Sequence, residues 1–226
     1  MRIVCTSDLH GYLPKALNFE SVELYATPHN LYRTYSSPEL PGGDVLVIAG
    51  DFSALGKLYE AVELNRWLGT VEIKHKILIA GNHDACCARE DLREIFTNAV
   101  YLQDSGIEID GIKFYGSPWS PRFLDWYFMM DRGSDKLKRQ LDCIPLGTDV
   151  VITHSPPAGK MDYSRGEYIG CELLRDRILT VKPKLHIFGH CHEGYGTAYN
   201  EHTIFVNASL CNGGYKPVNT PIVIDI

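Results

Sequence analysis

The sequence predicts an α/β fold, because short apolar runs alternate with helix-like patterns along most of the chain. Five runs have the length and near-continuous hydrophobicity of strands that are covered on both faces. They span residues 2–6, 45–49, 76–80, 149–153 and 185–188. Strands of this kind, separated by helices, are typical of sheets that carry helices on their outer faces.

Three helices are predicted from apolar residues that repeat with a period of about 3.6 residues. The first stripe is Leu55, Leu58, Tyr59 and Val62, the second is Ala88, Leu92, Ile95 and Phe96, and the third is Cys171, Leu174, Ile178 and Val181. Pro183 should end the third helix, because proline cannot continue helical hydrogen bonding.

Two further regions are predicted to be rich in strands. Residues 107–115 place Asp110-Gly111 between alternating apolar residues, which is a strong hairpin signal. Three more short strand candidates follow from about residue 194. These additions indicate a second sheet packed on the first.

The whole chain, residues 1–226, is expected to form a single domain with an inserted loop at about residues 12–42. This segment shows little periodicity. A surface loop of this length is often functional. An ordered loop without a catalytic role is an equally good interpretation.

Composition limits the classes of function. The chain has 226 residues, a net charge of −6 and no basic stripe, so binding to long nucleic acid is not expected. Seven cysteines at irregular spacing, without a CxxC pair, indicate a reducing compartment. The N-terminus reads as a strand rather than a signal peptide, and the apolar runs are far shorter than the roughly 20 residues that span a bilayer. We therefore expect a cytoplasmic protein without a membrane partner.

Polar side chains follow each of the five buried strands. They are Asp8 and His10, then Asp51, then Asn82, His83 and Asp84, then His154, and finally His190 and His192. Ligands of open α/β sheets bind beyond the carboxyl ends of the strands, so these side chains are expected to converge. The alternative is a set of polar caps and turn residues with no common role.

The residue types in this constellation favour divalent transition metals. Imidazole and carboxylate together suit manganese, iron, zinc or nickel, whereas magnesium and calcium prefer oxygen alone. Seven of these residues are candidate ligands, more than the coordination sphere of one ion holds: Asp8, His10, Asp51, Asn82, His154, His190 and His192. Asp51 stands alone in its loop as the candidate bridging carboxylate. Two divalent ions with Asp8, Asp51 and a bound hydroxide would carry a net charge of about +1, which attracts phosphate.

The ordered set DxH, GD, GNHD, His154 and GHxH resembles the calcineurin-like metallophosphoesterase superfamily. The match runs from residue 8 to residue 192. Residues 116–119, 153–157, 189–196, 206–209 and 221–225 also resemble the MPPED-type branch, which is related to class III cyclic nucleotide phosphodiesterases. Both resemblances imply a four-layer α/β/β/α sandwich of two mixed β-sheets flanked by helices.

The resemblance also implies roles for individual residues. One metal site would use Asp8, His10, Asp51 and His192, and the other would use Asp51, Asn82, His154 and His190. His83 would not bind metal; it would stabilise the phosphoryl group or protonate the leaving oxygen, while Asp84 would orient a neighbouring group.

The activity expected from the resemblance is hydrolysis of small nucleotide-like phosphodiesters by attack of a metal-bridging hydroxide. A phosphomonoesterase or a protein phosphatase is the alternative, since the same metal site can serve both. A metal-free binding scaffold is a further alternative. The sequence gives no indication of the oligomeric state.

Several other residues have a structural and a functional interpretation. His75, His186 and His202 are expected to be packed or surface histidines, and Cys191 a buried residue rather than a thiolate ligand. Trp119, Pro121, Phe123, Trp126 and Tyr127 form an aromatic cluster, which is either a base-stacking surface or, as we favour, core packing under a loop. Arg122 and Arg165 could bind phosphate, although solvated arginines are commoner.

Overall fold

The computed structural model describes residues 1–14 and 39–226, and its first sheet has five strands. They are β1 (Arg2–Thr6), β2 (Val45–Ala49), β3 (His75–Ile79), β4 (Val100–Tyr101) and β15 (Ile222–Asp225). Their order is β15-β1-β2-β3-β4, and only β15 runs antiparallel to its neighbour. Three of the five predicted buried strands lie in this sheet, within one residue of their predicted bounds, and the other two lie in the second sheet.

The second sheet has six strands. They are β5 (Ser105–Ile109), β6 (Ile112–Ser117), β9 (Val150–Thr153), β12 (Leu185–Phe188), β13 (Gly196–Tyr199) and β14 (Ile204–Asn207). Their order is β13-β14-β12-β9-β6-β5, with antiparallel strands at both edges. Two small two-stranded sheets pair β7 (Ser120–Pro121) with β8 (Met129–Met130), and β10 (Tyr163–Ser164) with β11 (Glu167–Tyr168).

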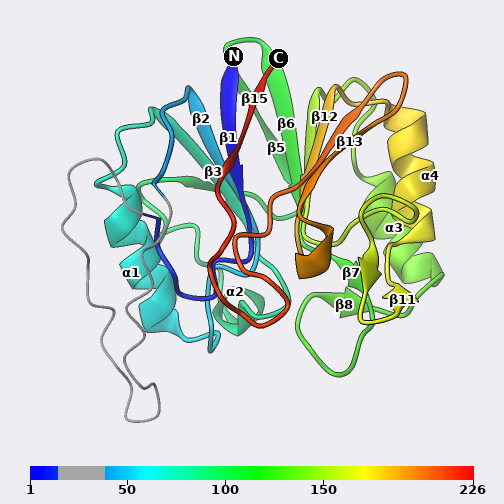
Figure 1. Cartoon of the computed structure of the whole chain (residues 1–226), viewed down its shortest axis with the longest axis horizontal. Helices are drawn as coiled ribbons and strands as arrows, with labels where there is room; N and C mark the ends of the chain where they lie inside the picture. The colour runs from blue at the N-terminus through cyan, green and yellow to red at the C-terminus, as the bar shows by residue number, and fades with distance from the viewer. Residues whose placement is uncertain (15–38) are drawn as a thin grey trace.

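Helices cover the outer faces of the two sheets, which confirms the predicted four-layer sandwich (Figure 1). The helices are α1 (Leu58–Leu68), α2 (Ala85–Arg89), α3 (Asp135–Asp142) and α4 (Glu172–Val181), with a 3₁₀ turn, η1 (His192–Gly194). α1 and α2 lie on the first sheet and α3 and α4 on the second, with the sheets between them.

The core divides into three layers of apolar contacts, one at each interface of the sandwich. β2 shows how the strands supply them: Val45, Val47 and Ala49 pack between the sheets, whereas Leu46 and Ile48 face α1. This alternation follows from the two-residue period of a strand. Full burial of each large aliphatic side chain stabilises the fold by about 1.5–3 kcal/mol.

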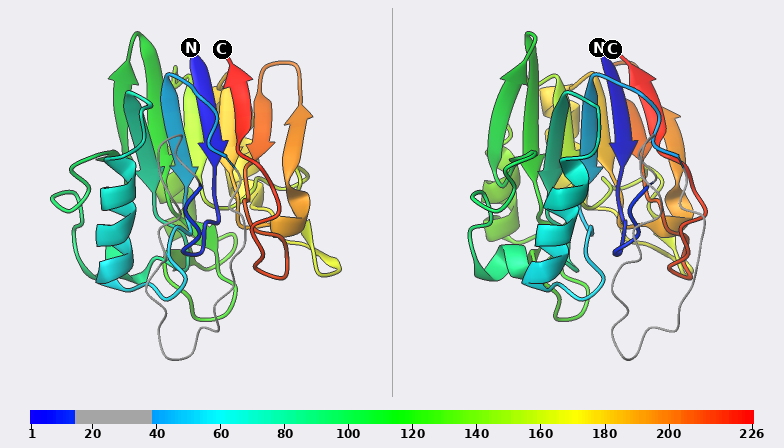
Figure 2. Two further views of the ribbon diagram at one scale, coloured as in Figure 1. Left: turned by 60° about the vertical axis from the view of Figure 1, so that its left-hand side comes forward. Right: turned by 90° about the vertical axis from the view of Figure 1, so that its left-hand side faces the viewer.

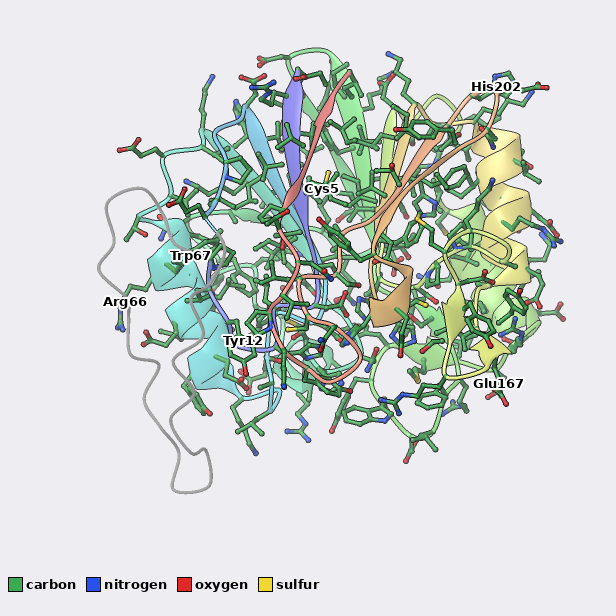
Figure 3. All side chains as sticks on the ribbon, in the orientation of Figure 1. Cys5, Tyr12, Arg66, Trp67, Glu167 and His202 are labelled. Atoms are coloured by element: carbon green, nitrogen blue, oxygen red, sulfur yellow. The ribbon has the colours of Figure 1, made fainter. Side chains whose placement is uncertain are left out.

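The predicted buried face of α1 is wrong. Ala61, Leu64, Trp67 and Leu68 are buried, whereas all four residues of the predicted stripe are exposed. Trp67 fixes the rotation of the helix, since its Nε1 atom donates a buried hydrogen bond of 2.9 Å to the Pro14 carbonyl. Figure 3 shows Trp67 on the side of α1 that faces the sheet and Arg66 on the outer side.

The second predicted helix is also wrong over most of its length. α2 ends at Arg89, and Glu90 has an extended backbone. Leu92 and Phe96 are buried as predicted, but they flank the turn at residues 93–95 instead of lying in a helix. The Asp91 carboxylate accepts a hydrogen bond from the Arg93 backbone N–H, and such side-chain turns compete with helical hydrogen bonding.

The other predicted elements are confirmed. All four residues of the third stripe are buried, and α4 ends at Val181, two residues before Pro183. Asp110 and Gly111 both have positive φ, as the tight turn between β5 and β6 requires. The three C-terminal strand candidates correspond to β13, β14 and β15, but only β13 and β14 join the predicted second sheet, whereas β15 pairs with β1 in the first sheet. Most of the expected insertion, residues 15–38, lies outside the described residues.

Two properties bear on the expected environment of the protein. All seven cysteines lie in the described ranges and are free thiols. Within residues 1–14 and 39–226, no helix combines the length and the apolar character that crossing a bilayer requires.

Candidate metal centre

The carboxyl ends of β1, β2 and β3 in one sheet and of β9 and β12 in the other point toward the same end of the molecule. Figures 1 and 2 show both chain termini at the opposite end. The loops that follow these five strands carry every predicted ligand, because parallel strands deliver their next residues to one edge. The two packed sheets thereby bring together residues that are up to 184 positions apart, such as Asp8 and His192.

The first group of side chains consists of Asp8, His10 and His192, whose ligand atoms lie within 4.8 Å of one another. The His192 Nε2 atom lies 3.2 Å from Asp8 Oδ1 and 3.2 Å from His10 Nε2. The His10 Nε2 atom also lies 4.0 Å from Asp51 Oδ2. All three side chains are almost fully enclosed.

The second group contains Asp51, His154 and His190, with Asn82 beside them. The His154 Nε2 atom lies 3.3 Å from Asp51 Oδ2 and 3.0 Å from Asn82 Oδ1. The same Asp51 oxygen therefore lies near both groups. This grouping parallels the two expected ligand sets; the ligand roles themselves stay a prediction.

The hydrogen bonds around the imidazoles show that these residues fit divalent cations. The Nδ1 atoms of His154 and His192 donate to the carbonyls of Ala49 and Asn212, so each Nε2 atom presents a lone pair in the neutral ring. Those lone pairs face the oxygens of Asp8, Asp51 and Asn82, which are acceptors as well. In the neutral rings no hydrogen lies between an Nε2 lone pair and the oxygen that it faces, so the two atoms repel each other unless a positive charge lies between them.

The pKa values point the same way. Burial alone would raise the pKa of Asp8, but the neighbouring imidazoles hold it well below its usual range. Burial alone would lower the pKa of His154, yet the Asp51 carboxylate raises it to about 10. Burial lowers the pKa of His10 and of His190 to about 4, so these two rings stay neutral. Positive charge is favoured only at His154 and His192, beside the carboxylates, where a cation can take the place of the proton.

The backbone at the site is held in unusual conformations. Asp8, His10, Asp51 and His190 all have positive φ, between 43° and 65°. Non-glycine residues seldom adopt this region, and each costs roughly 1–3 kcal/mol. Hydrogen bonds between the loops maintain it, including those from the Asp8 N–H to the Gly50 carbonyl and from the His10 N–H to the Asp51 carbonyl.

Glycine allows the loops to approach the carboxylates. A Cβ atom at Gly81 would collide with Asp51 Oδ1, and one at Gly189 would collide with Asp8 Oδ2 and Ser7 Oγ. At both positions a residue larger than glycine would force the loop away from the carboxylate.

His83 forms a further group with His10 and Asp51, whose ligand atoms also lie within 4.8 Å of one another, and its side chain lies at the mouth of the site. Its Nε2 atom is 4.0 Å from Asp51 Oδ2, and its backbone N–H donates to Asp51 Oδ1 at 2.8 Å. The side chain is 13% exposed, more than those of Asp51 and His10, so a substrate can reach it.

Asp84 joins two of the site loops. Its carboxylate accepts hydrogen bonds from the Ser53 N–H and hydroxyl and from the Gly81 N–H. Burial, and secondarily the Asp51 charge, raise the pKa of Asp84 to about 7. Its contacts fix the loops after β2 and β3 relative to each other.

The C-terminal loop supplies groups that the sequence pattern did not single out for the site. The Ser209 hydroxyl donates to Asp8 Oδ2 at 2.8 Å, and the Asn212 carbonyl orients His192. The Tyr215 ring lies 4.8 Å from the His10 ring and 5.3 Å from the His192 ring, centre to centre. The available signal was an aromatic residue directly after the turn-forming run Asn212-Gly213-Gly214.

The remaining histidines and cysteine behave as expected. His186 is fully buried and bonded to Thr153, His75 is partly buried, and His202 lies exposed at the far end of the molecule (Figure 3). Cys191 is buried with its Sγ atom 3.1 Å from the Tyr163 carbonyl, and it joins none of the ligand groups found among the described residues.

Some residues of the aromatic cluster pack in the core, whereas Trp126 lies at the site. The two arginines also lie in different environments. Trp119 and Tyr127 pack against the core, as favoured, but the Trp126 ring lies 4.4 Å from the His83 ring. Arg122 is bound to Asp131, whereas Arg165 is exposed in the turn between β10 and β11.

The four-layer sandwich groups acidic and imidazole side chains at the ends of strands from both sheets, where they could hold metal ions. Residues 1–194 match the family described as calcineurin-like phosphoesterase, and the chain belongs to this family.

Two relatives are similar in sequence to this chain over most of its length. Metallophosphoesterase domain-containing protein 1 of Homo sapiens is 40% identical over 216 residues, which cover 83% of this chain and 66% of that protein. UPF0046 protein K07C11.7 of Caenorhabditis elegans is 34% identical over 242 residues, which cover 100% of this chain and 75% of that protein. This chain thus spans just under two thirds of the length of its human relative.

Solved structures share the fold at low sequence identity. Phosphopantetheinyl hydrolase from Mycobacterium tuberculosis superposes with a TM-score of 0.57 at 13% identity, covering 97% of this chain and 95% of that one. The protein TT1561 of Thermus thermophilus gives a TM-score of 0.55 at 13% identity, with coverage of 91% and 88%. Both likenesses concern the fold alone.

Proposed function

We propose that the protein is a phosphodiesterase that hydrolyses small nucleotide-like phosphodiesters with the help of two divalent metal ions. The observation that carries the proposal is the convergence of two groups of acceptor atoms, with one oxygen of Asp51 near both. Membership in a phosphoesterase family supports hydrolysis of a phosphoric ester.

Two sets of residues would each hold one ion. Asp8, His10, Asp51 and His192 would hold one ion, and Asp51, Asn82, His154 and His190 would hold the other. Manganese, iron, zinc and nickel all suit this mixture of imidazole and carboxylate. When bound, such ions supply Lewis acidity that activates water and stabilises charge on the phosphoryl group.

His83 is the proposed general acid. Its backbone N–H is fixed to Asp51, its ring packs against His10, and its Nε2 atom points toward the cation pocket. A phosphoester held at the ions would place its leaving oxygen near this imidazole, which can donate the proton that the departing alkoxide needs. Asp84 and Ser209 would act by holding loops and Asp8 in position.

The proposed substrate is small because the chain offers little for a long polyanion. The net charge is −6, and the sequence carries no basic stripe. A cytoplasmic location is part of the proposal, since seven unpaired cysteines suit a reducing compartment.

The test is hydrolysis of bis(p-nitrophenyl) phosphate by the manganese-loaded protein and by two variants, Asp51→Ala and His154→Ala. We expect both variants to fall to the level of the protein-free blank, because each removes a group facing the cations. His202→Ala, far from the site, should keep wild-type activity. Retained hydrolysis in either site variant would defeat the assignment.

A parallel assay with p-nitrophenyl phosphate separates the proposed diesterase from a phosphomonoesterase or protein phosphatase. A higher kcat/KM for the monoester would favour those alternatives. Metal analysis addresses the scaffold alternative: about two ions per chain supports catalysis, and a metal-free protein after manganese loading supports a scaffold.

A further inference from the structure

We propose that Trp126 is the platform on which a nucleobase of the substrate stacks, next to the leaving-group side of the site. This inference deepens the proposed function and rests on it for the phosphodiester class of the substrate. It assigns the binding of the planar ring to one residue of the loop 122–128, between β7 and β8.

The loop that carries Trp126 is firmly held at both ends. Backbone hydrogen bonds join Ser120 to Phe128 and Arg122 to Met130, and the Arg122 side chain bonds Asp131 at 2.6 Å. Leu124 and Phe128 have positive φ, which only a well-determined loop maintains. Trp126 is therefore presented by a rigid support.

The aromatic residues on either side of Trp126 have structural partners. The Tyr127 hydroxyl lies 2.6 Å from an Arg89 nitrogen, and the Arg89 guanidinium lies over the Tyr127 ring. Phe128 is buried and packs edge-on against Trp119. These contacts fix the neighbours and direct Trp126 to the site.

Trp126 covers His83 and keeps free surface. Its ring centre lies 4.4 Å from that of His83, with an angle of 35° between the planes. The residue remains 40% exposed, although burying a tryptophan in the core would be favourable. Tyr215 lies on His83 as well, 6.0 Å away and 43% exposed, so two accessible rings border the proposed general acid.

This arrangement selects a substrate by shape. An ester oxygen that takes a proton from His83 carries its alcohol past the Trp126 ring, where a planar base can stack. Stacking on an aromatic side chain accepts any base, since every base has a π-face. We therefore expect preference for ligands with a base over ligands without one, and little discrimination among bases.

The test compares adenosine 5′-monophosphate with ribose 5-phosphate, which differ only in the base. Dissociation constants are measured by titration calorimetry on the manganese-loaded protein. In the wild type the nucleotide should bind about 5- to 150-fold tighter, the range given by base stacking. Trp126→Ala should reduce this ratio to near one, and Trp126→Phe, which keeps a ring, should restore most of it.

Phe123→Ala is the matched control, because Phe123 lies in the same loop, is 54% exposed and has no ring contact with His83 among the described residues. It should keep the wild-type ratio. Thermal unfolding midpoints of all variants establish that each is folded. An unchanged ratio in Trp126→Ala, or equal binding of both ligands by the wild type, overturns the proposal.

The outcome also separates this proposal from the proposed function. Hydrolysis of bis(p-nitrophenyl) phosphate with an unchanged ratio in Trp126→Ala would remove the stacking platform alone. The opposite result is a protein that hydrolyses no ester but whose preference for the nucleotide over ribose 5-phosphate is lost in Trp126→Ala. It would support the stacking role of Trp126 and contradict the phosphodiesterase activity.

Discussion

At the scale of single residues, the sequence predicted which side chains gather at the site, but it did not predict their strained backbone conformation. Asp8, His10 and Asp51 were singled out because they follow buried strands, and the structure brings them together. Their positive φ angles became visible only in the folded chain, since ordinary acidic and imidazole residues carry no mark of a left-handed backbone.

Substitution of Gly189 tests how closely the loops approach the carboxylates. Gly189→Ala places a Cβ atom against Asp8 Oδ2 and Ser7, and both belong to a packed site. We expect a loss of about 1–3 kcal/mol in the free energy of unfolding from overpacking. Manganese affinity should fall by about 10- to 100-fold, as when groups that orient metal ligands are altered. Urea titration and calorimetry measure the two effects.

Gly42→Ala is the control, because a Cβ atom there meets nothing within 4 Å. It should leave both quantities near their wild-type values. Unchanged manganese affinity in Gly189→Ala would show that Asp8 can move without consequence for the site.

At the scale of elements, strands and hairpins were predicted better than helix faces. The apolar runs of β1, β2 and β12 lie within the predicted ranges, because continuous burial on both faces is a local signal. α1 was misassigned because its sequence offers two apolar stripes. The stripe that includes Trp67 is the buried one, because the Trp67 indole donates a hydrogen bond to the carbonyl of Pro14, in another part of the chain.

Equivalent truncations on the two faces of α1 test this correction. Leu64→Ala should lower the free energy of unfolding by about 2–4 kcal/mol, because it opens a cavity between α1 and the first sheet. Leu58→Ala, at a residue that is 42% exposed, should cost less than about 1 kcal/mol. Chemical unfolding of both variants measures the difference; equal losses would contradict the observed rotation of the helix.

At the scale of the whole molecule, the site joins the two sheets. Asp8, His10, Asp51 and Asn82 follow strands of the first sheet, whereas His154, His190 and His192 follow strands of the second. Cations bound among them would link the halves of the sandwich and stabilise the folded state against the unfolded chain.

Manganese should therefore raise the thermal unfolding midpoint. At a free concentration of about 100 times the dissociation constant, binding adds about 2.7 kcal/mol to the free energy of unfolding, and a chelator should reverse the shift. Asp51→Asn, which keeps the size of the side chain but removes its charge, should lose most of the effect. Differential scanning calorimetry measures the unfolding midpoint with and without manganese. A wild-type midpoint that does not change when manganese is added would contradict the proposed metal centre.

The sequence alone determined the buried strands, the hairpin, the third helix and the candidate ligands at the strand ends, because burial period and residue type are local properties. Only the tertiary structure decided which face of α1 is buried, where α2 ends, and that Ser209, Asn212, Tyr215 and Trp126 reach the site. Those features depend on contacts between segments far apart in the chain, where packing energy outweighs local preference and no short-range pattern records the outcome.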